Sequence, residues 1–408
     1  MRILFVHQNF PAQYKHVAVA LKAMGHDVRA LTVDTNKQPE LIETWRYSFD
    51  SKSLRAGFPI AGRFTEHAAR ADAVGRRCLE LKQQGFEPEV ISGHLGWGET
   101  LFLKEVWPEA KLIVYAEFYY TTTGGDVGFD TEFESKDPTT AFRTVARQAS
   151  LLQAMEKADR GLAPTRWQAS RFPDAVRDKI EVIFDGIDTA VCAPDPKASI
   201  SLGRDKVSLK PGDEVVTFVN RNLEPYRGYH IFMRLLPRIL AARPKARVII
   251  VGADGVSYGA APPQGKKWKD IFLAEVQGKL DMARVHFVGH LPYETYLKVI
   301  QVSAAHVYLT YPFVLSWSML ESMSMEALII GSKTPPVEEL IRHEENGILV
   351  DFFDQKAIAD AVISALAEPE KYRHLRKAAR QTILDGYDLK TVCLPRQIKL
   401  IEDAARGA

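Results

Sequence analysis

The sequence has few cysteines, almost no net charge and no long apolar run. Its 408 residues include three cysteines, Cys78, Cys192 and Cys393, too few and too scattered for a disulfide framework or a thiolate metal site. We expect them to be buried and reduced. The 53 basic and 51 acidic residues leave a formal charge of +2, which argues against a general nucleic-acid binder.

Signals for export or membrane insertion are also missing. Residues 1–10 show no apolar run of signal-peptide length, and no segment approaches the roughly 20 apolar residues of a transmembrane helix. We therefore expect a cytoplasmic protein. Residues 52–64 carry three basic residues, no acidic ones, and Phe58 and Phe64. They fit either an ordinary solvated loop or peripheral contact with anionic lipid at the inner face of the membrane.

Several cofactor motifs are absent as well. No G-x-G-x-x-G stands at the first strand–helix turn, which argues against a standard dinucleotide-binding domain, and no G-x-x-x-x-G-K-S/T indicates a P-loop. The histidines lack metal-ligand spacing, and no Asp-x-Asp follows a strand to hold a divalent ion beside a diphosphate. We expect no metal and no cofactor.

Short Val- and Ile-rich runs alternate with helical patterns, which indicates parallel sheets covered by helices. The first set of predicted strands comprises residues 2–8, 26–33, 88–94, 111–118, 160–165 and 180–186. After a proline-containing connection at 193–212, a second set follows at 214–221, 246–252, 285–291, 306–312 and 328–334. The intervening segments 14–24, 98–108 and 229–240 are predicted helices. The sequence therefore predicts two doubly wound, Rossmann-like α/β domains, with ligands at the carboxyl ends of the strands and a site in the cleft between them.

Two arginines follow the first strand of the second set. Arg221 and Arg227 lie in the segment N-R-N-L-E-P-Y-R-G at 220–228, ahead of a predicted helix. Guanidinium groups there can bind a diphosphate and stabilise charge on a leaving phosphate. The alternative is a solvated basic stretch, since residues 221–247 hold seven basic residues and one acidic residue.

A second candidate is the segment 312–323, which follows a strand and leads into a helix. Ser316 and Ser318 are plausible N-caps, so the free N–H groups of this helix can meet a phosphate. Glu321 lies in its first turns, where its carboxylate either accepts from two ribose hydroxyls or merely complements the helix dipole. Gly252, at the end of another strand, permits close approach of a ligand, although such turns occur in every α/β domain.

The first domain offers polar residues at three strand ends. Gln8 and Asn9 follow the first strand, His94 ends the strand 88–94, and Glu117 lies near the end of the strand 111–118. These residues are candidates for binding or deprotonating an acceptor hydroxyl, and each is alternatively a capped or water-bound loop residue.

In combination, these segments resemble the retaining glycosyltransferases of family four (glycosyl transferases group 1), which have the GT-B fold. The resemblance spans nearly the whole chain and includes HQNFPAQYKHVAVALKAMGHDV, VIFDGIDTAVCAP, VNRNLEPYRG, VIIVGADG, VHFVGHLPYETYLKVIQVSAAHVYL and VEELIRHEENGILVDFFD. It implies an acceptor-binding domain at 1–195, a nucleotide-sugar-binding domain at 196–385, and a helix at 386–408 that packs back on the first domain.

The resemblance also implies roles for single residues. Arg221 and Arg227 would bind the donor diphosphate, and Glu321, the second Glu of the family's Glu-x7-Glu motif, would hold the ribose. Glu117 falls where many members carry a His that meets the reacting sugar and acceptor, and His94 is its neighbour. Further donor contacts are implied for Gly252, His290, Leu291, Leu315, Ser316, Trp317, Ser318, Met319, Leu320.

Three departures from the family pattern affect the expected donor. The first Glu of the motif is replaced by Phe313, so its contact to sugar hydroxyls is lost. Arg227 stands where Lys is usual, one residue farther along, and Glu117 replaces the usual His. A carboxylate at that position can accept a hydroxyl proton.

Together these features predict a metal-independent hexosyltransferase. It would move a sugar, with retention, from a nucleotide diphosphate sugar to a hydroxyl of a glycan or lipid-linked acceptor, with a UDP-sugar such as UDP-glucose as the favoured donor. Polysaccharide biosynthesis is the expected context. Two alternatives remain: a GT-B-fold nucleotide-sugar epimerase, and a non-catalytic nucleotide-sugar-binding homologue, which Phe313 suggests.

Overall fold

The computed structural model describes residues 1–54, 57–202 and 207–407, and it contains two compact units. Unit 1 comprises Met1–Gly128, Glu134–Gly186 and Lys390–Ala408, and unit 2 comprises Phe129–Phe133 and Ile187–Leu389. The contact division after Gly186 lies nine residues before the predicted boundary at 195. It falls there because Ile187 pairs with Asp388, and so joins the second unit.

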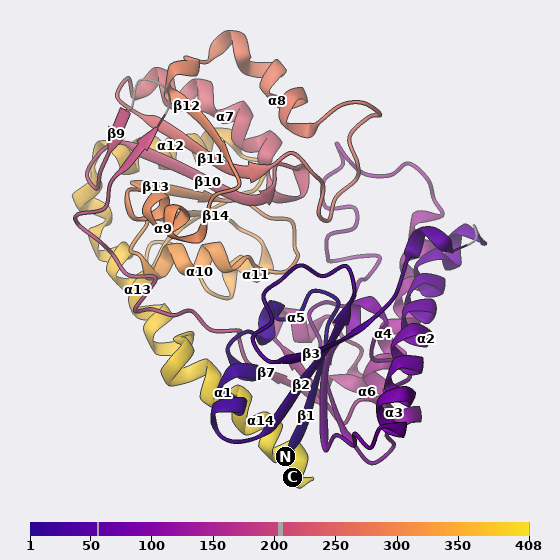
Figure 1. The fold of residues 1–408 in the computed structure, drawn as a ribbon. Coiled ribbons are helices and arrows are strands. Elements are labelled where there is room, and N and C mark those ends of the chain that lie inside the picture. The colour runs from indigo at the N-terminus through magenta and orange to yellow at the C-terminus, as the bar shows by residue number, and fades with distance from the viewer. Residues whose placement is uncertain (55–56, 203–206, 408) are drawn as a thin grey trace. The chain divides into compact units, whose positions relative to one another are not determined.

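Unit 1 is built on a seven-stranded parallel sheet with the order β3-β2-β1-β4-β5-β6-β7 (Figure 1). Its strands are β1 (Arg2–Val6), β2 (Asp27–Val33), β3 (Glu43–Tyr47), β4 (Val90–His94), β5 (Lys111–Tyr115), β6 (Arg160–Ala163) and β7 (Ile180–Val182). Its helices are α1 (Val17–Ala23), α2 (Gly62–Gln83), α3 (Leu103–Val106), α4 (Thr140–Lys157), α5 (Arg166–Ser170), α6 (Asp174–Arg177) and α14 (Leu394–Arg406).

Alternating side chains of β1 enter two separate cores, because successive residues of a strand point to opposite faces of the sheet. Ile3 and Phe5 pack with residues of α1 and α14. Leu4 and Val6 pack with residues of α2 and α4. Both faces are therefore covered, as the near-continuous apolar run of this strand predicted.

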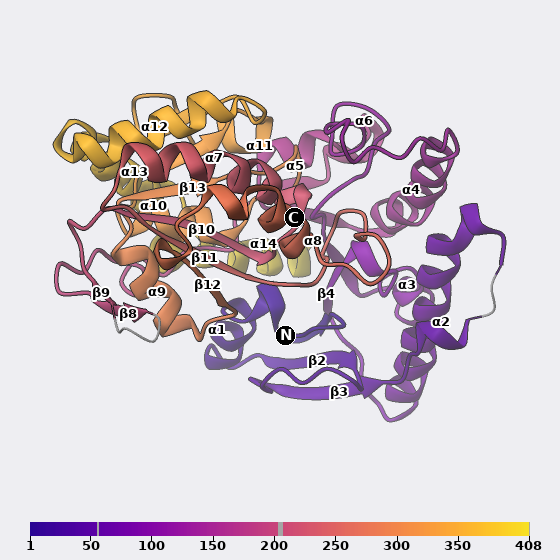
Figure 2. The same ribbon diagram turned by 90° about the horizontal axis from the view of Figure 1, so that it is seen from above.

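Unit 2 repeats the plan with a six-stranded parallel sheet of order β12-β11-β10-β13-β14-β15. Its strands are β10 (Val215–Asn222), β11 (Arg247–Ala253), β12 (Val285–Gly289), β13 (Ala305–Tyr308), β14 (Ile329–Ser332) and β15 (Ile348–Val350). Its helices are α7 (Tyr229–Ala242), α8 (Trp268–Val276), α9 (Tyr293–Gln301), α10 (Trp317–Ser324), α11 (Pro335–Glu338), α12 (Gln355–Ala367) and α13 (Arg373–Gly386), and Figure 2 shows α7 and α12 on the same side of this sheet.

The prediction of two Rossmann-like α/β domains is confirmed. So is the return of the C-terminal helix to the first of them, because α14 contacts α1, β4 and β5. Pro395 lies in the first turn of α14, where it displaces no helical hydrogen bond. The three cysteines are buried, as expected.

Several local predictions were wrong. The segment 98–108 contains only the short helix Leu103–Val106, because Gly98 adopts a left-handed conformation with φ of 89°. The strands β3 and β15 were missed. The connection at 193–212 contains an antiparallel pair, β8 (Ile200–Leu202) and β9 (Val207–Leu209), while its residues 203–206 lie outside the described part of the chain.

Candidate functional site

The turn between β10 and α7 positions Arg227. A 3-10 turn, Pro225–Arg227, is followed by Gly228 with φ of 72°. A Cβ at Gly228 would collide with Leu309, so glycine meets both a conformational and a steric requirement there. Arg227 itself is buried, and its Nη1 donates to Thr310 Oγ1 at 2.7 Å and to the carbonyl of Val314 at 2.9 Å.

The guanidinium of Arg227 lies among aromatic rings. Its Cζ is 5.4 Å from the ring centre of Tyr258 and 5.6 Å from that of Phe313. No carboxylate pairs with it among the residues that the structure describes. Arg221, by contrast, is exposed near the end of β10. Both arginines were expected to bind the diphosphate, but only Arg227 is held against the segment 310–314.

Glu321 is held between two tyrosines. Tyr293 and Tyr296 each donate a hydroxyl hydrogen to one of its carboxylate oxygens, both at 2.8 Å. Burial, followed by the charge of Glu321, raises the pKa of both phenols well above the usual value, so they remain donors. Because each carboxylate oxygen has a second lone pair, Glu321 can still accept a ligand hydroxyl.

The N-terminus of α10 begins at Ser316, whose side chain accepts the N–H of Ser318 at 3.3 Å. This confirms Ser316 as the N-cap. The N–H groups of Ser316 and Met319 also have partners, Tyr308 Oη and the Ser316 carbonyl. The segment therefore offers fewer free donors to a phosphate than its sequence suggested. Leu315, Ser318, Met319 and Leu320 are buried, whereas Trp317 is 38% exposed.

The remaining predicted donor residues lie at strand ends of unit 2. A Cβ at Gly252 would come within 2.7 Å of Leu223 Cδ2, so this glycine lets β11 pack against the loop after β10. His290 is exposed and Leu291 is half-buried. Both lead directly into α9, whose tyrosines hold Glu321, so the structure joins these two predicted parts of the donor site.

At the strand ends of unit 1, His94 and Glu117 face each other. His94 Nδ1 accepts the N–H of Gly96 at 3.0 Å, which leaves the proton of the neutral ring on Nε2. That Nε2 lies 3.4 Å from Glu117 Oε2. His94 is buried and Glu117 is half-buried, so the pair combines a fixed imidazole with a carboxylate that solvent or a ligand can reach.

The neighbouring residues serve mainly to order this edge. His7 Nδ1 accepts the N–H of Asn9 at 2.9 Å, and the His7 and His94 rings lie 5.4 Å apart in an edge arrangement. Burial, then the charges of His94 and Arg70, lowers the pKa of His7 well below the usual value, so His7 is neutral. The Gln8 carbonyl accepts from Thr32 at 2.9 Å, and Asn9 is exposed.

Sequence reasoning singled out neither Glu99 nor Glu224, which are both buried acids. In unit 1, Glu99 is fully buried, accepts from Tyr47 Oη at 2.6 Å, and has its pKa raised by burial. In unit 2, Glu224 is 1% exposed and binds backbone N–H groups of the segment 257–259. The available signal for Glu224 was its position as the one acidic residue among seven basic ones at 221–247.

Two further features are a cluster of possible metal ligands in unit 2 and a small cavity in unit 1. Ligand atoms of Asp130, Glu132 and His230 lie within 4.8 Å of one another, but the two carboxylates already accept hydrogen bonds from Tyr311 and Arg234. We therefore interpret the group as a hydrogen-bonded ion-pair network.

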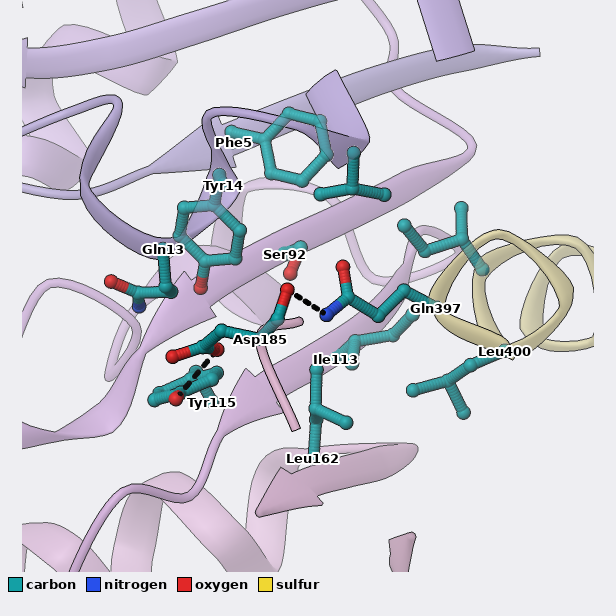
Figure 3. A pocket seen from close by; sticks show the side chains of 12 residues that line it. Phe5, Gln13, Tyr14, Ser92, Ile113, Tyr115, Leu162, Asp185, Gln397 and Leu400 are labelled. Carbon is teal, nitrogen blue, oxygen red and sulfur yellow. Dashed lines mark hydrogen bonds between the residues drawn. The ribbon is translucent and has the colours of Figure 1, made fainter. Parts of the chain in front are cut away.

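A cavity of about 20 Å³ under α14 is bordered by Tyr14, Asp185 and Gln397, as Figure 3 shows. It has room for about one water molecule and is too small for a sugar.

Comparison with known proteins gives a consistent set of similarities. A family model described as glycosyl transferase family 4 group matches residues 24–192, and one described as glycosyl transferases group 1 matches residues 202–382. The chain is 24% identical over 229 residues to a D-inositol 3-phosphate glycosyltransferase of Segniliparus rotundus, covering 55% of this chain and 48% of that protein. It thus spans about half the length of several curated relatives that it matches.

Other similarities extend over the full chain. A GDP-mannose-dependent alpha-(1-6)-phosphatidylinositol monomannoside mannosyltransferase of Mycolicibacterium smegmatis is 22% identical, with 95% of both chains covered. Among solved structures, sucrose-phosphate synthase of Thermosynechococcus elongatus has a TM-score of 0.73 at 16% identity, with 100% of both chains covered. Anabaena HepE in complex with UDP and glucose has a TM-score of 0.67 at 16% identity, covering 99% of this chain and 100% of that one.

Proposed function

Because the chain belongs to the glycosyl transferases of family 4, group 1, we propose that it is a hexosyltransferase that uses a nucleotide diphosphate sugar. The proposed donor is a UDP-sugar such as UDP-glucose. The proposed acceptor is a hydroxyl of a glycan or lipid-linked sugar, in polysaccharide biosynthesis. The reaction would need no metal and would retain the configuration at the anomeric carbon.

The observation that carries the proposal is the buried guanidinium of Arg227. Burying a cation is costly unless an anion compensates it, and Arg227 has only neutral acceptors, Thr310 and the Val314 carbonyl, among the described residues. A diphosphate supplies the missing negative charge through charge-assisted hydrogen bonds. The same group then stabilises the leaving phosphate as the glycosidic bond to the donor breaks.

The other predicted site residues would bind the ribose and the acceptor. Glu321, held by its two tyrosines, would accept from the ribose hydroxyls. The pair His94–Glu117 would bind the acceptor hydroxyl, and the departing phosphate would take its proton. Arg221, which is exposed, would add a second contact to the diphosphate of the bound donor.

The identity of the base rests on the comparisons. HepE was solved with UDP and with UDP-glucose, whereas the mannosyltransferase that matches the full chain is named for GDP-mannose. The first experiment is therefore a calorimetric screen of UDP-glucose, GDP-mannose and ADP-glucose. We expect a UDP-sugar to bind most tightly.

Replacing Arg227 by Ala tests the proposed role of the buried cation. Loss of a charge-assisted contact to phosphate should weaken donor binding by about 100-fold and abolish donor hydrolysis and transfer. Arg238→Ala is the matched control, since Arg238 is an exposed arginine of unit 2 that pairs with Asp360. Activity that survives both Arg227→Ala and Glu321→Ala would show that the donor site is wrongly assigned.

Two alternative functions make different predictions. A nucleotide-sugar epimerase of the same fold would convert the UDP-sugar without any acceptor, so incubation with the donor alone decides between them. A non-catalytic homologue, which Phe313 suggests, would bind the donor and show neither hydrolysis nor transfer.

We also propose that unit 1 contacts anionic membrane. Phe58 is 71% exposed beside the turn Pro59–Ala61, which contacts α4, where Phe142 and Val145 are 58% and 56% exposed. Phe64 is 37% exposed, and Arg55 and Ala56 lie outside the described residues. No helix among the described residues is long and apolar enough to cross a membrane.

Vesicle co-sedimentation tests this contact. Wild-type protein should bind vesicles containing anionic lipid in a salt-sensitive way, and Phe58→Ser with Phe142→Ser should weaken that binding. Val256→Ser is the control, because Val256 is a 39% exposed side chain of unit 2. Binding that is absent at low salt, or equal for all variants, would end the idea.

A further inference from the structure

We propose that Tyr258 is the side chain that recognises the donor sugar and that Glu224 is the residue that positions it. This inference rests on the proposed donor site and identifies a contact within it. No motif predicted either residue. Three features of unit 2 support it: the buried carboxylate of Glu224, which holds a loop, the exposed ring of Tyr258 beside the buried Arg227, and the absence of a carboxylate at residue 313.

Glu224 holds the loop that follows β11. Its carboxylate is 1% exposed and accepts the backbone N–H groups of Ser257, Tyr258 and Gly259 at 3.0 to 3.3 Å. Three N–H donors from consecutive residues compensate the buried carboxylate and give this loop one conformation.

Asn222 adds two further bonds to the same loop. Its Nδ2 donates to Ser257 Oγ at 2.6 Å, and its Oδ1 accepts the N–H of Gly255 at 3.1 Å. The loop after β11 is therefore fixed to the segment that carries Arg227. A loop held by so many hydrogen bonds is a rigid support for a binding residue.

The hydrogen bonds of Glu224 and Asn222 place the ring of Tyr258 beside the proposed diphosphate site. Its centre lies 4.9 Å from that of Phe313 and 5.4 Å from the Cζ of Arg227. Tyr226 completes the group, with its ring centre 5.8 Å from that of Tyr258. Phe313 is fully packed, whereas Tyr258 is 42% exposed. Of these two rings, Tyr258 is thus the one that offers surface to a ligand.

The chemistry of Tyr258 suits the task that residue 313 cannot perform. Phe313 has no hydrogen-bonding group, so a sugar next to it finds no carboxylate acceptor. A phenol at the neighbouring position both donates and accepts a hydrogen bond, and its ring face packs against the C–H groups of a hexose. A phenol is also neutral, so it does not repel the diphosphate that Arg227 is proposed to bind. We infer that the sugar is recognised by one hydroxyl contact and ring packing.

Calorimetry with UDP and UDP-glucose, or with the pair that the donor screen selects, tests the inference. The contact concerns only the sugar. Tyr258→Phe should therefore weaken UDP-glucose binding about fivefold to tenfold and leave UDP binding unchanged. Tyr258→Ala should weaken UDP-glucose binding further, again with little effect on UDP. Tyr372→Phe is the control, since its phenol bonds Ser364 instead.

Glu224→Gln tests the positioning role. The amide cannot accept three N–H groups as a carboxylate does, so the KM for the donor should rise while kcat changes little. Adding Glu224→Gln to Tyr258→Ala should cause no further loss, because both act through one ring. Melting temperatures of all variants check the fold.

The outcomes separate the inference from the function on which it rests. If the wild-type protein binds neither UDP nor UDP-glucose, nor any other nucleotide pair, the proposed function fails and the inference fails with it. If the wild type binds both ligands and Tyr258→Phe and Tyr258→Ala change neither affinity, or change both equally, only the inference is overturned.

Discussion

The two sheets present different chemistry at their strand ends. Unit 1 carries imidazoles and carboxylates, with His94 facing Glu117 and His7 packed behind them. Unit 2 carries a buried arginine among aromatic rings and a carboxylate between two phenols. An imidazole that faces an accessible carboxylate offers hydrogen bonds to a hydroxyl group, whereas a guanidinium and phenols with a raised pKa keep one charge state near neutral pH. The same architecture thus provides one edge suited to binding a hydroxyl group and one suited to binding an anion.

The largest effect expected from a change in unit 1 concerns His94. His94→Gln removes the imidazole but keeps a hydrogen-bonding side chain, so kcat for transfer should fall about 100-fold, because the acceptor hydroxyl loses a group that is proposed to orient it. Binding of the nucleotide should be unchanged, because unit 2 is untouched. Steady-state kinetics and calorimetry measure the two quantities, with exposed His374→Gln as the control. A parallel loss of nucleotide binding would contradict the proposed assignment of acceptor binding to unit 1 and donor binding to unit 2.

A smaller effect concerns the pH dependence of stability. Burial, followed by the charge of Arg147, lowers the pKa of His67 to about 4, and its Nδ1 lies 2.7 Å from Ser150 Oγ. The unfolded chain takes up a proton below about pH 6.5 while folded His67 stays neutral. The free energy of unfolding should therefore fall between about pH 6.5 and 4, by at most about 3 kcal/mol from this residue.

His67→Gln should remove that part of the acid sensitivity. Amide hydrogen exchange across this pH range can measure unit 1 and unit 2 separately. Unit 2 has buried histidines of its own, among them His306, whose pKa burial lowers to about 3, so the stability of unit 2 provides an internal reference. An unchanged acid slope in unit 1 of the variant would contradict the assignment.

The smallest effect concerns the phenols of unit 2. Tyr296→Phe removes one of two donors to Glu321, which should weaken nucleotide binding by about 1 kcal/mol, or roughly fivefold. Because the pKa of Tyr296 lies well above the usual value, this loss should be the same from pH 5 to 8. Tyr115→Phe, which removes a bond to Asp185 in unit 1, is the matched control. A loss of nucleotide binding that changes between pH 5 and 8 would contradict the conclusion that these phenols keep one charge state.

Much of the fold followed from sequence periodicity. The strands β1, β2, β4, β5, β10, β11 and β12 appear close to their predicted ranges, because buried parallel strands form apolar runs rich in Val and Ile. Predictions were poorer where a single left-handed residue decides the path, as at Gly98, or where a strand is short, as with β3 and β15. The N-cap at Ser316 could be predicted because capping is a local interaction.

The sequence by itself determined which residue types stand at the strand ends, since order along the chain and alternation place them there. Only the tertiary structure decided what each can do. Arg221 and Arg227 are alike in sequence, but one is exposed and the other is buried against Thr310 and Val314, residues more than 80 positions away. Glu224 likewise accepts the N–H of Tyr258 only because β10 and β11 pair. Burial and partners depend on long-range packing, which no local pattern encodes.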